Sequence, residues 1–380
     1  MAAINVSGTI APGWERVQYA FGESFTQRGD VGASLSVVLD GKRMVDLWGG
    51  YTDASLTTEW QEDSIVNVYS TTKGITAIAA AILVDRGELD VNGAVVRYWP
   101  EFGGAGKSGI PVRWLLSHEA GLPVIDAPIP PGGALDWGTM TRLLQQQTPV
   151  WQPGTKMGYH AVTYGWLVGE VIRRITGKSP GAFVRDEIAK PLGVDFFIGT
   201  PAREDGRIAS MIPQAAGLAG NADPNSLAAR ALGLAGPPAG AGVNTREWRA
   251  AELPAANGHT NARALAHIYG CLARGGDLGG VRLLRKKTIE TFATEVVSGD
   301  DAVIGIHARR GLGFIISSPG GRYHWGPNPR SFGHSGAGGS LGFADPDAKL
   351  GLGYAMNKMA SGLSADPRWT PLIDAVYACL

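Results

Sequence analysis

Strand-forming runs lie near both ends of this chain, and a long stretch with helical periodicity separates them. Near the start, residues 34–39 and 43–48 alternate around Asp40-Gly41, a pair typical of a β-hairpin turn. Three further runs with strand character lie near the end, at 313–317, 340–344 and 350–356. An isolated hairpin is marginally stable, so we expect the two ends of the chain to meet in one antiparallel sheet.

Helices are expected on either side of this sheet. Apolar residues at helical spacing predict one helix from Trp14 to about Gly29 and a final helix over 363–377. The strongest apolar helix of the middle region includes residues 75–84. The stretch 215–243 is rich in Gly, Ala and Pro, and we expect a surface loop or a lid there.

These patterns predict an α+β fold with two subdomains. Residues 1–58 and 291–380 form an antiparallel sheet from the N- and C-terminal strands, flanked by the terminal helices. Residues 59–290 form a large, mostly helical inserted subdomain. No repeat with a fixed period is present to suggest a solenoid or a propeller.

Composition excludes two classes of protein. The 380 residues include 34 Lys and Arg and 34 Asp and Glu, and 44% of them are hydrophobic. A chain with zero formal net charge has no basic excess to neutralise phosphates, so we do not expect a nucleic-acid partner. Intrinsic disorder requires low hydrophobicity and high net charge, and this chain has neither.

The chain has two cysteines, Cys271 and Cys379, too few for a disulfide framework or a four-cysteine zinc site. The first 16 residues lack the basic and apolar regions of a secretory signal, and the apolar stretch 75–84 is too short to cross a bilayer. We therefore expect a cytoplasmic protein without a membrane segment, a metal or a cofactor. Neutral charge leaves the oligomeric state open.

Two glycine motifs match known patterns but stand in the wrong context. Residues 104–109 have the spacing of a dinucleotide-binding loop, yet no strand is expected before them, so we predict a polar surface loop. Residues 338–342 match the nucleophile elbow of α/β-hydrolases, with Ser340 as the nucleophile. That fold needs a histidine after the serine, and all seven histidines precede Ser340.

The strongest chemical signal is the segment 69–74 at the start of the apolar helix. If Ser70 begins that helix, Lys73 lies one turn further on the same face. A serine hydroxyl becomes a nucleophile when a neighbouring base takes its proton, and a lysine with a lowered pKa can be that base. The alternative is an ordinary helix start, with Ser70 as the N-cap and Lys73 as a first-turn lysine.

Two further segments fit the same chemistry. Tyr159 precedes a helix expected over 164–175, and a phenol beside Lys73 can share the proton transfer. Residues 333–339 are rich in glycine and lie on an expected C-terminal strand, where backbone N–H groups can point at an oxyanion.

The order and spacing of these segments resemble the serine β-lactamase and penicillin-binding-protein-like hydrolases, specifically the class C-like carboxylesterases of the family VIII type. Ser70-x-x-Lys73 resembles the first motif of that group. The segment 159–161 resembles the Tyr-x-Asn motif, and 334–336 resembles the Lys-Thr-Gly motif. The resemblance extends from about residue 15 to residue 375.

The resemblance implies a β-lactamase/transpeptidase-like fold with the active site at the junction of the two subdomains. It implies that Ser70 attacks an ester carbonyl and that Lys73 and Tyr159 act as general base and then general acid. The backbone N–H groups of Ser70 and Ala337 would form the oxyanion hole. Candidate substrate-binding residues are Tyr69, His334, Ser335 and Gly336.

Two departures from the family motifs concern the substrate. His334 replaces the lysine that binds the carboxylate of a β-lactam, and a histidine is a weaker, pH-dependent cation. Ala161 replaces the asparagine that holds an amide side chain. Hydrolysis of small acyl or aryl esters through an acyl-Ser70 suits these changes best. The alternatives are a β-lactamase, peptidase, amidase or acyltransferase on the same machinery, or a non-catalytic binding protein.

Overall fold

The computed structural model describes residues 5–213, 223–234, 242–360 and 366–380. In this part of the chain, segments from the two ends form one nine-stranded antiparallel sheet with the order β1-β3-β2-β15-β14-β13-β12-β11-β10. Its strands are β1 (Val6–Ile10), β2 (Gly32–Leu39), β3 (Lys42–Gly50), β10 (Val297–Asp300), β11 (His307–Arg310), β12 (Ile315–Ile316), β13 (Phe332–Ser335), β14 (Leu341–Asp345) and β15 (Leu350–Met356). The two ends join where β2 pairs with β15, which confirms the expected sheet.

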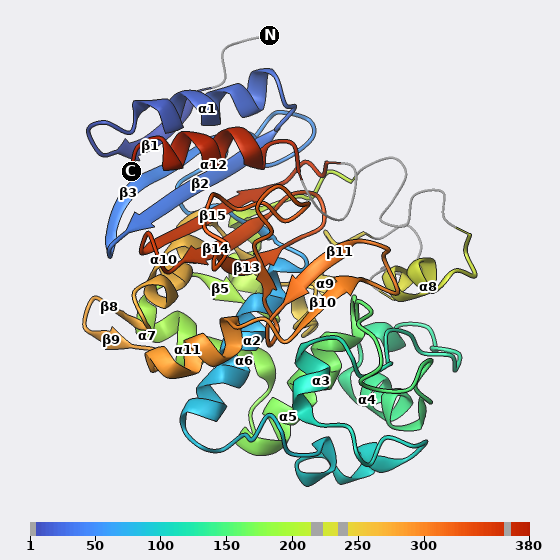
Figure 1. The fold of residues 1–380 in the computed structure, drawn as a ribbon. Helices are drawn as coiled ribbons and strands as arrows, with labels where there is room; N and C mark the ends of the chain where they lie inside the picture. The colour runs from blue at the N-terminus through green and yellow to red at the C-terminus, as the bar shows by residue number, and fades with distance from the viewer. Residues whose placement is uncertain (1–4, 214–222, 235–241, 361–365) are drawn as a thin grey trace.

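Helices cover both faces of the sheet (Figure 1). α1 (Glu15–Thr26) and α12 (Trp369–Tyr377) lie side by side on one face. α10 (Ala262–Ala273) packs on the opposite face against β2, β14 and β15. Glycine in β15 permits this close approach, because a Cβ atom at Gly351 would lie 2.1 Å from the backbone nitrogen of Gly270. The predicted α+β architecture with flanking terminal helices is therefore confirmed.

The middle of the chain is mostly helical, as expected. Its remaining helices are α2 (Thr71–Asp85), α3 (Val112–Leu116), α4 (Trp137–Gln146), α5 (Thr163–Thr176), α6 (Pro180–Val184), α7 (Lys190–Leu192), α8 (Leu227–Gly233), α9 (Arg246–Ala250) and α11 (Lys286–Ala293). It also holds short strands that the sequence did not predict: β4 (Ile65–Asn67), β5 (Phe196–Phe197), β6 (Ile208–Ala209), β7 (His259–Thr260), β8 (Asp277–Leu278) and β9 (Val281–Arg282). The division of the chain at residues 58 and 290 stays a prediction, and α10 packs on the large sheet although it precedes residue 290.

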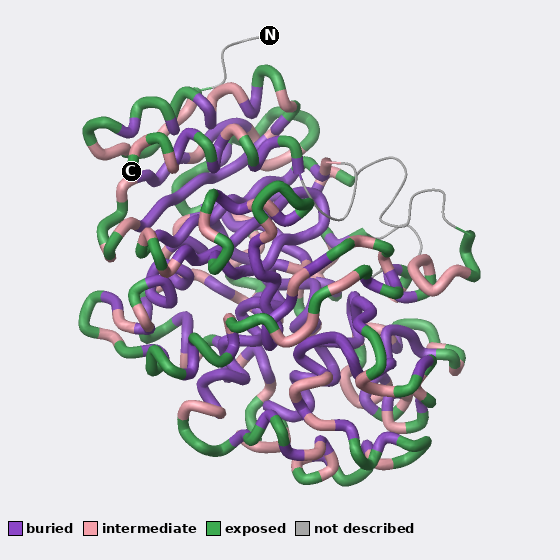
Figure 2. Tube along the Cα trace, in the orientation of Figure 1, coloured by how far each residue is buried: buried purple, intermediate pink, exposed green. Residues whose placement is uncertain are grey.

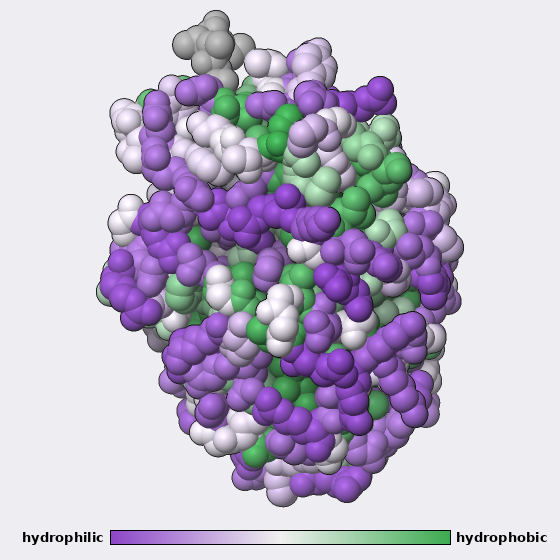
Figure 3. Space-filling model, turned by 90° about the vertical axis from the view of Figure 1, so that its left-hand side faces the viewer, coloured by the Kyte–Doolittle hydropathy of each residue, from purple (hydrophilic) through white to green (hydrophobic). Residues whose placement is uncertain are grey.

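The central helix α2 is buried on all sides. Every residue from Thr71 to Leu83 is buried, including Lys73. A helix that is apolar around its whole circumference is stable only inside the protein, so α2 forms the centre of the core between the sheet and the other helices. Figure 2 shows this core, and the face in Figure 3 is mostly hydrophilic with smaller apolar patches.

Three local predictions need correction. The strand expected over 313–317 is only Ile315–Ile316. The loop expected over 215–243 contains α8, while residues 214–222 and 235–241 lie outside the described residues. The final helix begins at Trp369, and residues 361–365 of the predicted range also lie outside the described part.

The loop expected over 104–109 is also more than a polar surface loop. The Lys107 side chain is buried, and its ammonium group donates to the carbonyl oxygens of Gln145 at 2.9 Å and Gln147 at 2.6 Å.

Among the helices in the described ranges, none is long and apolar enough to cross a membrane.

Candidate active site

Ser70 lies at the N-terminal end of α2, directly after a strained residue. Tyr69 has φ 44°, the left-handed region that non-glycine residues rarely adopt. The first helical N–H groups are occupied by backbone acceptors, since Thr71 donates to Val68 and Thr72 to Tyr69. Within the described structure the Ser70 hydroxyl makes no capping hydrogen bond, so the N-cap alternative does not describe it.

Lys73 is the buried partner of Ser70. Its Nζ lies 3.0 Å from Ser70 Oγ, 2.7 Å from the Ala161 carbonyl oxygen and 2.9 Å from the Ala255 carbonyl oxygen. A neutral amine has two N–H donors and one lone pair. If Lys73 is uncharged, the two carbonyl groups match its two donors, and its lone pair is left to accept from the serine hydroxyl.

The Tyr159 phenol completes the group of side chains around Ser70. Tyr159 hydrogen-bonds with Ser70, and Lys73 Nζ lies 4.8 Å from the centre of the phenol ring. The structure thus brings Ser70, Lys73 and Tyr159 together, from α2 and from the segment just before α5.

Burial sets the protonation of these groups. It lowers the pKa of Lys73 well below that of an ordinary lysine, and the charge of Arg310 lowers that pKa further. Burial also raises the pKa of Tyr159, with a smaller opposing effect from its hydrogen bond to Ser70. Both shifts favour the uncharged forms, an amine at Lys73 and a phenol at Tyr159.

Ser70 and Ala337 line the same cavity, and each carries a backbone N–H group. Among the described residues, neither the Ser70 nor the Ala337 N–H has a protein acceptor, and both residues line the cavity. The loop that carries Ala337 is fixed at its far side, where Arg368 donates to the Gly338 carbonyl and Trp369 Nε1 donates to the Gly339 carbonyl at 2.7 Å. Unpaired N–H groups held in a rigid loop are the donors that an oxyanion hole requires.

Gly336 and Ser340 hold this loop against the start of α2. A Cβ atom at Gly336 would lie 2.2 Å from the Val68 carbonyl oxygen and 2.2 Å from Ser340 Oγ, so only glycine permits the contact. Ser340 is buried and donates to the Val68 carbonyl at 2.7 Å, and its Oγ lies 3.0 Å from Thr71 Oγ1. Ser340 is thus a structural link rather than an exposed elbow serine.

The cavity above Ser70 is narrow, with a volume of about 30 Å³. The predicted site residues that line it are Tyr69, Ser70, Tyr159, His334, Ser335 and Ala337. Apolar side chains complete the described wall: Val162, Leu232, Ala256, Ile304 and Ile315, together with Ala161 and Tyr323. Gly336 is not in the described wall and lies behind the cavity, against Val68 and Ser340.

His334 is neutral, which corrects the pH-dependent cation that we expected. Its Nδ1 lies 2.7 Å from the Ser335 carbonyl oxygen and therefore carries the proton. The buried Nε2 has no hydrogen-bond partner among the described residues. Burial lowers the pKa of His334 well below the ordinary value.

Four groups behind Tyr159 were not singled out from the sequence. The His118 ring lies 5.1 Å from that of Tyr159, and His160 N donates to His118 Nδ1 at 3.1 Å. Burial lowers the pKa of His160 to about 4 and that of His118 well below the ordinary value. Asp301 and Arg310 form a buried ion pair beside the same ring. No short motif links these residues, because they come from separate segments.

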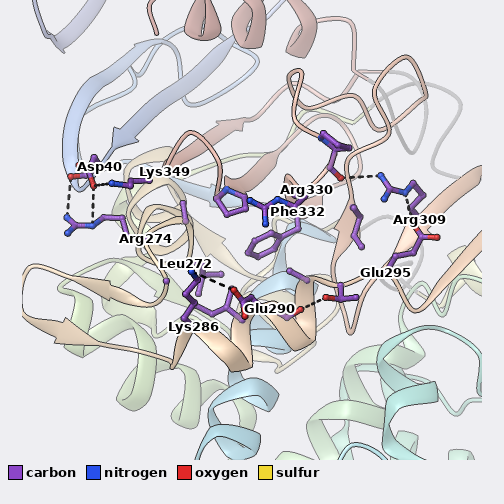
Figure 4. A pocket seen from close by; sticks show the side chains of 18 residues that line it. Asp40, Leu272, Arg274, Lys286, Glu290, Glu295, Arg309, Arg330, Phe332 and Lys349 are labelled. Carbon is purple, nitrogen blue, oxygen red and sulfur yellow. Dashed lines mark hydrogen bonds and ion pairs between the residues drawn. The ribbon is translucent and has the colours of Figure 1, made fainter.

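A wider pocket of about 530 Å³ lies elsewhere and shares no lining residue with the Ser70 cavity. Figure 4 shows its charged side chains in pairs, with Asp40 between Arg274 and Lys349, and Arg309 at 2.6 Å from Glu295. These paired, mostly exposed charges offer no reactive group. Among the described residues, no cluster of three His, Cys, Asp or Glu side chains is placed to hold a metal ion.

Known proteins share this fold and are similar to this chain over most of its length. A model of the beta-lactamase family matches residues 11–377. The esterase/beta-lactamase LipL of Mycobacterium tuberculosis is 34% identical over 382 residues, covering 95% of this chain and 85% of the relative. The crystal structure of a family VIII carboxylesterase is 42% identical with a TM-score of 0.91, covering 99% of this chain and 100% of that one. A penicillin-binding protein homologue from Caulobacter crescentus has a TM-score of 0.91 at 36% identity, with the same coverage.

Proposed function

The chain belongs to the beta-lactamase family, and from this premise we propose that it is a serine carboxylesterase that hydrolyses small acyl or aryl esters through an acyl-Ser70 intermediate. The single observation that carries the proposal is the 3.0 Å contact between Ser70 Oγ and the buried Lys73 amine. A neutral amine at this distance accepts the serine proton as the hydroxyl attacks.

The first half of the reaction forms the acyl-enzyme. Ser70 Oγ attacks the ester carbonyl carbon while its proton moves to Lys73 Nζ. The negative charge that develops on the carbonyl oxygen is stabilised by the N–H groups of Ser70 and Ala337. The C–O bond to the alcohol then breaks, and the leaving oxygen takes a proton from the Tyr159 hydroxyl, which Lys73 reprotonates.

The second half returns the enzyme to its resting state. A water molecule takes the place of the alcohol and gives a proton to the Tyr159 and Lys73 pair as its oxygen attacks the acyl carbon. The bond to Ser70 Oγ breaks, Ser70 recovers its proton, and the carboxylic acid leaves. Each proton taken up in one half is returned in the same half, so no cofactor is needed.

The wall of the cavity favours a neutral ester over a β-lactam. A β-lactam carries a carboxylate, and the neutral His334 offers no positive charge to bind it. The remaining described wall is mostly apolar, which suits a small acyl or aryl group. Family relatives include proteins named as esterases and as penicillin-binding proteins, so amide hydrolysis and acyl transfer remain the competing activities. We place the enzyme in the cytoplasm, where free thiols such as Cys271 and Cys379 persist.

Substrate comparison tests this proposal. Purified protein is assayed with p-nitrophenyl acetate, p-nitrophenyl butyrate and a chromogenic cephalosporin at equal concentrations. We expect kcat/KM for the esters to exceed that for the cephalosporin by at least about 30-fold, since a missing charge partner costs about 2 kcal/mol. Equal turnover of cephalosporin and ester would reject the ester assignment. Added methanol separates hydrolysis from acyl transfer, because a dominant methyl ester product would indicate a transferase.

A further inference from the structure

We propose that Arg310 is a positioning residue whose fixed positive charge beneath the Tyr159 ring keeps Lys73 an uncharged base. This inference rests on the proposed function of Ser70 and Lys73 and adds a residue to it. Arg310 is the last residue of β11, and its guanidinium is almost fully buried. A buried guanidinium stays protonated, so its charge is present at every pH at which the protein is folded.

Two nitrogen groups lie close to one aromatic ring. The Arg310 guanidinium carbon lies 5.2 Å from the centre of the Tyr159 ring, and Lys73 Nζ lies 4.8 Å from it. If Lys73 were protonated, two positive charges would share one buried ring with little water to screen them. The Arg310 guanidinium is itself close enough to this ring for a cation–π contact.

Asp301 anchors Arg310. Asp301 Oδ2 lies 3.3 Å from an Arg310 nitrogen. Asp301 Oδ1 accepts hydrogen bonds from the backbone N–H groups of Tyr159 at 2.8 Å, Val303 at 3.0 Å and Ile304 at 3.1 Å. These three charge-assisted hydrogen bonds stabilise the carboxylate, and the bond from the Tyr159 N–H also holds the Tyr159 backbone in place.

The other titratable groups around Lys73 and Tyr159 do not supply this charge. They come from several packed segments, and they are His118, His160, Tyr164, Tyr269, Tyr323 and His334. Burial lowers the pKa of the three histidines and raises that of Tyr164 and Tyr269, so these five are neutral at pH 7. In the described part of the chain, Arg310 and Asp301 are the permanent charges at this site.

The position of Arg310 also explains how the site works without a lysine in the third motif. That motif carries His334, which burial keeps neutral and whose ring centre lies 6.4 Å from that of Tyr159. The positive charge near the phenol thus comes from β11 instead of β13. Arg310 lies over the Tyr159 ring and is not among the residues that line the described cavity, so its charge acts on the base without contact with the substrate.

The test compares Asp301→Asn with the double variant Asp301→Asn/Arg310→Met. Asparagine keeps an oxygen acceptor for the three N–H groups, and methionine fills the volume of the arginine stem. Replacing both members of a buried ion pair by neutral residues generally preserves folding. The readout is the second-order rate of Ser70 labelling by a fluorophosphonate as a function of pH, which reports on the base and needs no ester substrate.

We expect the acid limb of this profile to lie about one pH unit higher in the double variant than in Asp301→Asn, because Lys73 holds its proton to higher pH without Arg310. Equal midpoints in the two variants, even with lower rates, would overturn the proposal and leave Arg310 a structural role. Arg310→Lys gives a second test: it retains the charge, so its midpoint should match the wild type, and a shift as large as that of the double variant would also overturn the proposal. Wild-type protein that is labelled at Ser70 but hydrolyses no ester would reject the proposed function and leave this inference standing.

Discussion

Ser70 Oγ and Lys73 Nζ lie 3.0 Å apart inside the protein, one turn apart on the buried helix α2. The contact needs no side-chain rearrangement before proton transfer, because the carbonyl oxygens of Ala161 and Ala255 already hold the amine. Catalysis in this account depends on the amine being buried and uncharged, and the predictions below follow from that requirement.

Removal of the amine should abolish activity. Lys73→Ala is expected to lower kcat/KM for p-nitrophenyl acetate by at least about 1000-fold, since the other group bonded to Ser70, the Tyr159 phenol, has a raised pKa and is a poor base without Lys73. Lys107→Ala is the matched control. Lys107 is also buried and bonded to two backbone carbonyls, but it lies outside the Ser70 cavity. The Lys107→Ala variant should be less stable than the wild type and keep kcat/KM within a few-fold of the wild-type value. Equal losses of kcat/KM in the two variants would contradict the role of Lys73 as the base.

Removal of the Tyr159 hydroxyl should show how much of the activity depends on proton transfer by this group and how much on the packing of its ring. Tyr159→Phe keeps the ring between Lys73, Arg310 and His334 and loses only the oxygen that bonds with Ser70. We expect kcat to fall about 100- to 10,000-fold, the usual range for one positioned acid or base, with little change in the melting temperature. Calorimetry and steady-state kinetics on the same preparation measure both. Wild-type kcat in this variant would remove Tyr159 from the mechanism.

A methyl group at Gly336 should move the oxyanion loop away from Ser70. Gly336→Ala forces a Cβ atom against the Val68 carbonyl and Ser340 Oγ, at a cost of about 1–3 kcal/mol in unfolding free energy. The Ala337 N–H then shifts, and labelling of Ser70 should slow at least about 10-fold. Ala337→Gly keeps the N–H group and serves as the control, with near wild-type labelling. Unchanged labelling in Gly336→Ala would show that the loop does not position the donor.

The stability of the protein should fall in mild acid. Burial lowers the pKa of five histidines, including His267, and for His259 it lowers the value to about 3. Below about pH 6.5 the unfolded chain takes up protons on these groups that the folded chain does not. The unfolding free energy is therefore highest above pH 6.5 and falls as the pH drops, by up to about 1.4 kcal/mol per histidine and pH unit.

Urea denaturation at pH 7.0, 6.0 and 5.5 measures this slope. His259→Gln should reduce it by the share of one histidine, because His259 lies outside the Ser70 cavity and its Nδ1 contacts only a backbone carbonyl among the described residues. An unfolding free energy that stays constant between pH 7.0 and pH 5.5 would contradict the claim that these buried histidines are neutral in the folded protein.

Patterns local in sequence predicted the hairpin of β2 and β3, the helix α2 and the strand β15 well. β1, β10 and β11 were missed because they are short, and their residues do not alternate in polarity. The pairing of β2 with β15 was predicted only in outline, since register between distant strands depends on packing rather than on neighbouring residues.

The same reasoning explains what the sequence revealed of the site. Ser70, Lys73 and Tyr159 belong to motifs of recognisable spacing. Ala161 lacks the amide side chain of the family motif, yet its backbone carbonyl bonds to Lys73, and no residue pattern predicts a backbone contact. Arg310 is the last residue of the segment His307–Arg310, whose polar residues predict an exposed strand. Only the structure shows that the Arg310 side chain is buried.

Reaction with a fluorophosphonate, followed by mass spectrometry of the labelled peptide, tests the central claim most directly. Wild-type protein should carry one phosphonyl group on Ser70, Ser70→Ala should carry none, and Ser340→Ala should react at close to the wild-type rate. A label on Ser340, or full labelling of Ser70→Ala, would contradict the account.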